Sequence, residues 1–290
     1  MTAPPTVPGP PPASSAAMDV VDPVISINDV TLRFGGVTSL ADVNVQAPRG
    51  EVLAVIGPNG AGKTSLFNCL TGVYQPQAGT IWLHPNRDER VSLTGRKPHV
   101  VTRLGIARTF QNIRLFNALT VLENVKVGCD SRGNAGPISV MLGLPWMRRE
   151  ERGATQRALE LIDFVGLAGR HDALAASLSY GEQRRLEIAR ALATTPTVLL
   201  LDEPAAGTNP AEKNDLERLI RRINTETGAS VLLIEHDMRL VMSVATRVVV
   251  LNFGRVIATG TPEQVQRDPA VVEAYLGTAA DDEDADAAPD

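Results

Sequence analysis

Apolar and polar residues alternate along two stretches near the start of the chain, which is the pattern of a half-buried strand. The first stretch covers residues 25–34 and the second covers residues 40–45. Residues 81–83 form a third, shorter run. Residues 52–56 are apolar without interruption, as expected for a strand that is buried on both faces. The first hundred residues therefore predict a strand-rich region, with one helix after residue 62.

From residue 98 onward the apolar positions recur at helical spacing. The pattern covers residues 100–105, 119–127 and 151–165, so we expect an inserted helical subdomain at about residues 98–185. The intervening residues 137–146 are apolar and rich in glycine and proline. They fit either a loop and short helix packed on the helical region, or a surface that meets a partner in or near the membrane.

The last third of the chain has the character of a parallel sheet with connecting helices. Short apolar runs predict four strands, at residues 197–201, 230–234, 246–251 and 255–258. Helical spacing predicts three helices, at residues 211–225, 261–267 and 269–276. The last two strands, separated by a turn at residues 252–254, form a hairpin. The sequence thus predicts an α/β fold, in which a strand-rich region, a helical region and a region of parallel-sheet character follow one another.

The two ends of the chain differ from the rest in composition. Residues 1–22 are rich in proline and alanine, and residues 279–290 are acidic. We expect both to be disordered tails that flank a folded domain at residues 23–278. Met18 is an alternative start, because the periodic pattern begins only at Val24. The sequence assigns no role to the acidic tail.

Charge and cysteine content narrow the class of protein. The net charge of the 290 residues is −5, and six acidic residues lie among the last ten. Without these six the net charge is +1, which argues against a dedicated nucleic-acid binder with a basic face. Cys69 and Cys129 lack the spacing of a metal site, so we expect reduced thiols and a cytoplasmic protein. No segment approaches the roughly 18 apolar residues of a membrane span.

The clearest chemical signal lies between the strand at residues 52–56 and the helix that follows it. Gly57, Gly62, Lys63 and Thr64 have the spacing of a phosphate-binding loop. Glycines let successive backbone N–H groups turn toward one point, and the helix start adds the positive end of its dipole. A lysine can then reach the β- and γ-phosphates, and a threonine hydroxyl can hold Mg²⁺.

Four further elements follow this loop. Gln111 comes after a predicted helix, and the segment Leu178-Ser-Tyr-Gly-Glu-Gln183 opens another helix. A strand then ends in Asp202 and Glu203, and the next strand ends in His236. Alone, a glutamine or a histidine is a weak signal, and paired carboxylates at a strand end can simply cap a helix. The phosphate-binding loop and these four elements, taken in order, are a much more specific signal than any one of them.

This order resembles the nucleotide-binding subunit of ATP-binding cassette (ABC) transporters, over about residues 24–277. The leucine-serine-x-glycine signature at residues 178–181 is the decisive part. Four shorter segments resemble the branched-chain amino-acid importer branch, at residues 34–36, 107–116, 205–210 and 274–277. The segment between Gly128 and Glu151 resembles the first of the two ATPases in such importers. Thr208, Ser65 and Glu182 depart from the usual residues, but none of these changes removes a reacting group.

The resemblance implies an α/β fold, a P-loop ATPase cassette with a mixed or parallel sheet core, an antiparallel β subdomain and an inserted α-helical subdomain. Such a cassette binds ATP and Mg²⁺. The residues that would bind ATP are Phe34, Gly57, Pro58, Asn59, Gly60, Ala61, Gly62, Lys63, Thr64, Ser65, Ser179, Gly181, Glu182 and Asn209. Thr64, Gln111 and Asp202 would hold Mg²⁺, since a buried carboxylate is costly without a cation. Glu203 would activate the attacking water. His236 would bond the γ-phosphate and orient Glu203, and Gln111 would contact Mg²⁺ or the water. Phe34 would stack on the adenine.

The resemblance also implies partners. A second ABC ATPase, either a paralogue or another copy of this chain, would pair with it head to tail. Two membrane-spanning permease subunits and an extracytoplasmic solute-binding protein would complete an importer at the cytoplasmic face of the membrane, with no nucleic acid. The alternatives are an ABC ATPase for a different solute and a soluble, non-transport ABC protein. Neither the solute nor the identity of the second ATPase can be chosen from the residues.

Overall fold

The structure, a computed structural model, describes residues 20–130 and 145–275. The predicted acidic tail lies outside these ranges, as do residues 1–19 of the predicted N-terminal tail. Most of the apolar segment at residues 137–146 also lies outside them. No helix in the described ranges is long and apolar enough to cross a membrane.

The first sheet is antiparallel and has the strand order β2-β1-β4-β5. Its strands are β1 (Pro23–Phe34), β2 (Val37–Pro48), β4 (Ala78–Leu83) and β5 (Val91–Ser92). The apolar positions Ile25, Ile27, Val30 and Leu32 are all buried, as predicted, but Ser26 and Thr31 between them are buried too, so burial does not strictly alternate along β1. Both long strands extend beyond their predicted ends, and the two-residue β5 was not predicted.

The second sheet has the order β10-β9-β3-β8-β7-β6. Its strands are β3 (Val52–Ile56), β6 (Ile106–Arg108), β7 (Val198–Asp202), β8 (Ser230–Ile234), β9 (Arg247–Asn252) and β10 (Arg255–Gly260). All residues of β3, β7 and β8 are buried, as predicted. These strands are parallel, and Ile234 is in register with both Val55 and Asp202. The residues that follow the three strands therefore emerge at one edge of the sheet.

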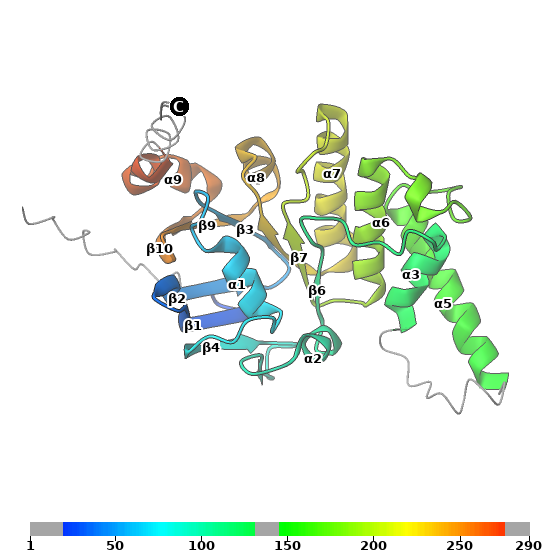
Figure 1. Cartoon of the computed structure of the whole chain (residues 1–290), viewed down its shortest axis with the longest axis horizontal. Helices are drawn as coiled ribbons and strands as arrows, with labels where there is room; N and C mark the ends of the chain where they lie inside the picture. The colour runs from blue at the N-terminus through cyan, green and yellow to red at the C-terminus, as the bar shows by residue number, and fades with distance from the viewer. Residues whose placement is uncertain (1–19, 131–144, 276–290) are drawn as a thin grey trace, which may run out of the picture.

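Helices cover the sheets and form a separate group at one side of the molecule, where α3, α5 and α6 pack together (Figure 1). The helices are α1 (Lys63–Leu70), α2 (Pro98–Arg103), α3 (Val121–Asp130), α5 (Pro145–Phe164), α6 (Tyr180–Ala193), α7 (Pro210–Arg222), α8 (Met238–Val244) and α9 (Pro262–Gln266). Residues 269–275 are also helical. A 3₁₀ turn covers Ala175–Ser177, and a π-helical turn covers Ile223–Thr227.

Two elements differ from the prediction. The strand β6 lies within the range expected to be helical, and it extends the sheet beside β7. The helix α8 was not predicted, although Asp237 caps it by accepting a hydrogen bond from the Leu240 N–H. Both elements flank the sheet edge at which β3, β7 and β8 end.

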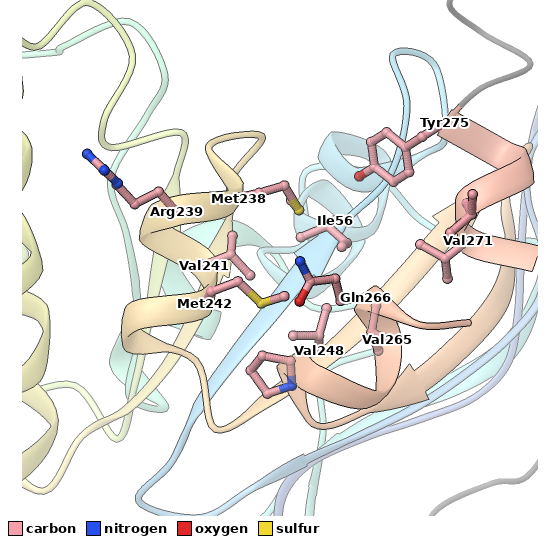
Figure 2. Close-up of a pocket in the computed structure, with 12 residues that line it drawn as sticks. Ile56, Met238, Arg239, Val241, Met242, Val248, Val265, Gln266, Val271 and Tyr275 are labelled. Atoms are coloured by element: carbon pink, nitrogen blue, oxygen red, sulfur yellow. The ribbon is translucent and has the colours of Figure 1, made fainter. Parts of the chain in front are cut away.

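An apolar groove of about 460 Å³ lies between α8 and the C-terminal helices (Figure 2). Ile56, Met238, Met242 and Val265 are among the residues that line it. Tyr275 lies at one end of the groove. Burial raises the pKa of its hydroxyl, and a hydrogen bond with the Gly57 backbone opposes part of this shift. Apolar walls of this kind suit an apolar group rather than a phosphate.

Candidate functional site

The loop between β3 and α1 has the tight backbone that its glycines predict. Gly57, Gly60 and Gly62 have φ values of 148°, 77° and 100°, which lie in the region that favours glycine. A Cβ atom on Gly57 would lie 2.0 Å from the Leu251 carbonyl oxygen, and one on Gly62 would lie 2.6 Å from that of Ser39. Larger residues at these two positions would push the loop away from β9 and β2.

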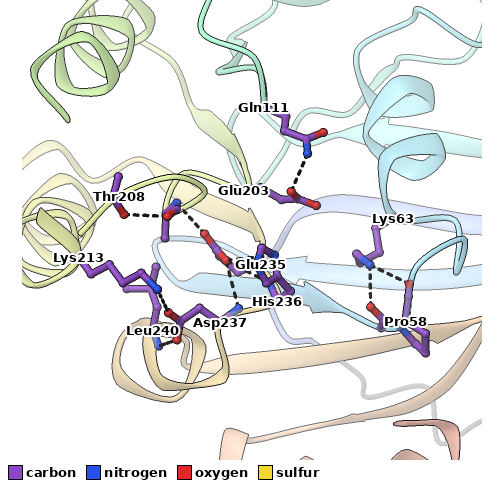
Figure 3. A network of polar contacts seen from close by, with 12 residues as sticks. Pro58, Lys63, Gln111, Glu203, Thr208, Lys213, Glu235, His236, Asp237 and Leu240 are labelled. Carbon is purple, nitrogen blue, oxygen red and sulfur yellow. Dashed lines mark hydrogen bonds and ion pairs between the residues drawn. The ribbon is translucent and has the colours of Figure 1, made fainter. Parts of the chain in front are cut away.

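Lys63 folds back over this loop at the start of α1. Its Nζ donates to the carbonyl oxygens of Gly57 and Pro58, at 2.6 and 2.9 Å (Figure 3). No side-chain hydrogen bond caps the N-terminus of α1, so its first N–H groups can receive an anion. Burial lowers the pKa of the Lys63 ammonium, and the carboxylates of Glu203 and Asp202 oppose this shift. The lysine thus shares one site with both predicted carboxylates.

The other residues of the loop differ in exposure. Asn59, Gly60 and Thr64 are exposed, whereas Pro58 and Ala61 are buried. Ser65 is half-buried, and its hydroxyl accepts a hydrogen bond of 2.7 Å from Ser39. Thr64 is therefore the hydroxyl of this turn that is open to an incoming ligand.

Asp202 has a partner that the sequence did not predict. Its side chain is 4% exposed, and its Oδ2 lies 2.6 Å from Nη2 of Arg108. The same guanidinium donates to Asn68 of α1 at 2.7 Å. A buried carboxylate needs a cation, and here the arginine of β6 provides one. Arg108 thus already compensates the charge for which the sequence suggested Mg²⁺, and the role of Asp202 as a metal ligand stays a prediction.

Glu203 and Gln111 lie together, as predicted. The Gln111 amide Nε2 donates to Glu203 Oε2 at 2.9 Å (Figure 3). Glu203 has a φ of 46°, a left-handed conformation that costs free energy in a residue other than glycine. Strained backbone that the surroundings hold in place is typical of functional sites.

A buried ion pair on α6 holds the loop that carries Gln111. Arg184 donates to the carbonyl oxygens of Phe110 and Gln111 at 2.6 and 2.8 Å, and to Glu187 at 3.0 Å. Glu187 accepts hydrogen bonds from the N–H groups of Phe110 and Arg114. Burial raises the pKa of the Glu187 carboxyl, and Arg184 opposes this shift. Sequence reasoning missed this pair, because both residues look like ordinary polar positions of a helix.

His236 is exposed, and no contact among the described residues joins it to Glu203. The neighbouring Glu235 is fully buried instead, and its carboxylate accepts hydrogen bonds from the backbone of two loops (Figure 3). Glu235 could have been noticed, because it directly follows a buried strand, as Glu203 does. The predicted roles of His236 toward phosphate and Glu203 stay predictions.

The predicted signature opens α6 through a capping box. The Ser179 Oγ accepts a hydrogen bond from the Glu182 N–H, and Glu182 accepts one from the Ser179 N–H. The Glu182 carboxylate also pairs with Arg170, and the cap lowers its pKa. Glu182 thus stabilises the start of the helix, and its predicted contact with nucleotide stays untested.

Gly181 and Asn209 lie beside each other at the starts of α6 and α7. A Cβ atom on Gly181 would lie 2.4 Å from Glu212, which forms a capping box with Asn209. Ser179 and Asn209 are both exposed. Figure 1 shows α6 well separated from α1, so this surface is not part of the chain's own phosphate loop.

Phe34 lies at the end of β1 with its side chain available for contact. It is 46% exposed, and its ring meets Tyr74 edge-on with the ring centres 5.0 Å apart. An exposed ring that a neighbour fixes in place can stack on a planar base. Its predicted contact with adenine stays a prediction.

The predicted metal ligands are chemically suited to Mg²⁺, which prefers oxygen atoms. Thr64 offers a hydroxyl and Asp202 a carboxylate, of which Oδ2 is bound to Arg108. The Gln111 nitrogen is bound to Glu203, which leaves its carbonyl oxygen. In the described ranges, no cluster of three His, Cys, Asp or Glu side chains could hold a metal without such other ligands.

A second groove, of about 680 Å³, lies beside the Gln111 loop. It is lined by β6, the loop after it, α3 and α6, and Phe110, Arg114 and Arg190 are among its residues. Phe116 and Val127 present apolar surface there and are 49% and 42% exposed. The combination of arginines and exposed apolar side chains suits a protein partner.

Comparisons with known proteins agree with this geometry. A family model described as "ABC transporter" matches residues 40–206, and one described as "Branched-chain amino acid ATP-binding cassette transporter" matches residues 255–281. The high-affinity branched-chain amino acid transport ATP-binding proteins LivG of Escherichia coli (strain K12) and BraF of Pseudomonas aeruginosa are each 45% identical. Each match covers 89% of this chain and 99% of the relative. A crystal structure of the ADP conformation of MJ1267, an ATP-binding cassette of an ABC transporter, superposes with a TM-score of 0.75. MJ1267 in that structure is 30% identical to this chain, and the match covers 88% of this chain and 99% of the MJ1267 chain.

Proposed function

Because this chain belongs to the ABC transporter family of ATP-binding proteins, we propose that it is the ATPase subunit of an importer for branched-chain amino acids. The observation that carries the proposal is the convergence of Lys63, Asp202 and Glu203 on one phosphate site, with Gln111 bound to Glu203. The names of the relatives that are 45% identical support this choice of solute.

ATP is the substrate, and its phosphates would occupy the loop from Gly57 to Thr64. Lys63 would exchange the carbonyl groups of this loop for the β- and γ-phosphates, since an ammonium binds an anionic oxygen more strongly than a neutral carbonyl oxygen. Glycine N–H groups and the start of α1 would bind the remaining phosphate oxygens. Phe34 would stack on the adenine.

Hydrolysis would depend on residues at the ends of β7 and β8. Glu203 would hold the attacking water and accept its proton, and Gln111 would fix the orientation of that carboxylate. His236, whose side chain is exposed and lies with Nδ1 3.9 Å from Glu235 Oε2, would contact the γ-phosphate. Mg²⁺ held by Thr64, Asp202 and Gln111 would neutralise charge on the β- and γ-phosphates.

The surface of Ser179, Gly181 and Asn209 would complete the phosphate site of a second ATPase subunit. Ser179 opens α6, a helix start that favours an anion, and it is exposed rather than directed at its own loop. A head-to-tail pair would bury two ATP molecules, and ATP would favour closure because it binds the closed state better. The second subunit would be a paralogue or another copy of this chain.

The groove lined by Phe110, Phe116 and Arg190 would receive a segment of one of two membrane-spanning permease subunits, and the second ATPase subunit would receive a segment of the other. It adjoins the Gln111 loop, so a change at the nucleotide site could move the surface that the permeases contact. The chain would thus be peripheral, at the cytoplasmic face of the membrane, and an extracytoplasmic binding protein would deliver the solute. No nucleic acid would take part.

Reconstitution tests this proposal. The chain would be purified with the two permeases and the second cassette from neighbouring reading frames, and ATPase activity would be measured in liposomes. We expect binding protein loaded with leucine, isoleucine or valine to stimulate hydrolysis severalfold. Stimulation by another solute alone would replace the substrate class, and ATPase activity indifferent to permeases would favour a soluble, non-transport ABC protein.

A further inference from the structure

Glu235 is a buried carboxylate that lies between the two loops of the hydrolysis site. It is 0% exposed and directly follows β8. Its Oε1 accepts a hydrogen bond of 2.7 Å from the Ala205 N–H, two residues after Glu203. Its Oε2 accepts hydrogen bonds from the N–H groups of His236 and Asp237, at 3.1 and 3.2 Å. One side chain therefore fixes both the turn after Glu203 and the loop that carries His236 (Figure 3).

The turn after Glu203 needs such support because of its strain. Glu203 has a φ of 46°, a conformation that persists only where several contacts enforce it. The Glu203 N–H donates to the Ile234 carbonyl oxygen at 2.9 Å, and the Ala206 N–H donates to that of Glu203 at 3.1 Å. Two side chains also hold this turn: Glu235 accepts from the Ala205 N–H, and the Thr208 hydroxyl donates to the Ala205 carbonyl oxygen at 2.7 Å.

The loop that carries His236 is held from its other side as well. Asp237 caps α8 through the Leu240 N–H and pairs with Lys213 of α7 at 2.6 Å. With Asp237 fixed from outside and Glu235 from inside, the backbone of His236 has little freedom. Its side chain is exposed, and its Nδ1 lies 3.9 Å from Glu235 Oε2, so Glu235 also faces the imidazole that would meet a ligand.

A carboxylate is suited to this position because it accepts hydrogen bonds at both oxygens. Glutamine has the same shape but one acceptor oxygen, so its amide nitrogen would face an N–H group of one loop. Burial of the carboxyl raises its pKa, and the backbone N–H groups from both loops oppose this shift. The three hydrogen bonds therefore lower the free-energy cost of a carboxylate at this fully buried position.

We propose that Glu235 is a positioning residue for ATP hydrolysis, which sets Glu203 and His236 at the spacing that they need around the γ-phosphate. The inference rests on the proposed ATPase function. Glu235 touches neither the phosphate loop nor Lys63 in the described contacts, so it acts on the hydrolysis step rather than on ATP binding.

The test compares Glu235→Gln and Glu235→Asp with Ser230→Ala in the assembled transporter. Ser230 is a matched control at the other end of β8, since it is buried and its Oγ accepts the Gly50 N–H at 2.8 Å. We expect kcat for ATP to fall at least tenfold in both Glu235 variants while KM stays within threefold. Ser230→Ala should lower thermal stability and leave kcat within twofold.

Three results would overturn the inference. They are an unchanged kcat in both Glu235 variants, a fall in kcat of the same size in Ser230→Ala, or a loss of fold in both Glu235 variants by circular dichroism. The last result would assign Glu235 to stability alone. A wild-type chain without ATPase activity would contradict the proposed function instead, so the two failures can be distinguished.

Discussion

Arg108 and Asp202 form a buried ion pair, with 2.6 Å between Nη2 and Oδ2, at the edge of the sheet where the phosphate loop begins. The two residues come from adjacent parallel strands, and Arg108 also binds Asn68 of α1. The guanidinium therefore joins the carboxylate end of β7 to the helix that follows the loop. It also lies three residues before Gln111, so it links three parts of the site.

Removal of this arginine should destabilise the protein. In Arg108→Ala the Asp202 carboxylate is buried without a partner, and breaking a buried pair in this way costs about 3–5 kcal/mol. Mg²⁺ with ATP should restore part of the loss, because the metal supplies a new cation. Thermal melting with and without Mg-ATP measures both effects. Arg218→Ala is the control, since that arginine pairs with Asp215 at the surface and should contribute at most about 1 kcal/mol. Equal melting temperatures for the two variants would refute the structural role of Arg108.

Loss of the catalytic base should separate binding from turnover. Glu203→Gln keeps a hydrogen-bonding partner for Gln111, so ATP·Mg should still bind and a long-lived closed dimer should accumulate. Loss of a general base typically lowers the rate by about 10²- to 10⁴-fold. Single-turnover hydrolysis measures the rate, and size-exclusion chromatography with ATP measures the dimer. A variant that hydrolyses ATP at a near-normal rate would remove Glu203 from this role.

The Arg184–Glu187 pair should control the Gln111 loop. Lysine in place of Arg184 keeps the charge but lacks the planar fork that reaches Phe110, Gln111 and Glu187 together. We expect Arg184→Lys to lose about 1.5–3 kcal/mol of stability in urea unfolding and to show reduced ATPase activity. Arg218→Lys, on the exposed surface of α7, should change neither quantity. If both variants behave like the wild type, the buried pair does not position Gln111.

The two cysteines should differ in reactivity. Burial raises the pKa of the Cys69 thiol to about 12, whereas Cys129 is half-buried. At pH 8 the Cys69 thiolate is then roughly one part in 10⁴, and the thiolate is the reactive form. A thiol pKa raised on folding also means that stability falls as the pH rises from about 9 toward 12. Mass spectrometry after iodoacetamide treatment should find Cys69 unmodified in native protein and modified in urea. Equal labelling of Cys69 and Cys129 in native protein would contradict this burial.

Features set by local sequence were predictable. The spacing of Gly57, Gly62 and Lys63 determines the turn and the helix start almost by itself, and uninterrupted apolar runs marked β3, β7 and β8. Only the resemblance to a family assigned Gln111 and Glu203 to one catalytic site, because 92 residues separate them in the chain, and their direct hydrogen bond was not predicted.

Features that depend on distant partners were not predictable. The strand β6 has three residues, too few for a periodic pattern, so Arg108 gave no sign that it would meet Asp202. Glu235 has its role because a turn 30 residues away directs the Ala205 N–H toward it. The helix α8 could have been found from Asp237 as its N-cap and from the apolar positions that follow.

Two measurements together test most directly the claim that two subunits share each ATP. They are the ATP affinity of the monomer and the ATPase rate of the assembled transporter. Lys63→Ala should weaken ATP binding by the monomer, because a direct charge contact with phosphate is lost. Ser179→Arg should leave monomer binding intact and abolish hydrolysis, because a large side chain blocks the γ-phosphate of the opposite subunit. Loss of one preorganised donor at such a site costs about 2.7–4 kcal/mol of transition-state stabilisation, and steric exclusion should cost at least as much. If Ser179→Arg instead removes monomer binding as fully as Lys63→Ala does, the signature serves its own subunit, and the shared site is contradicted.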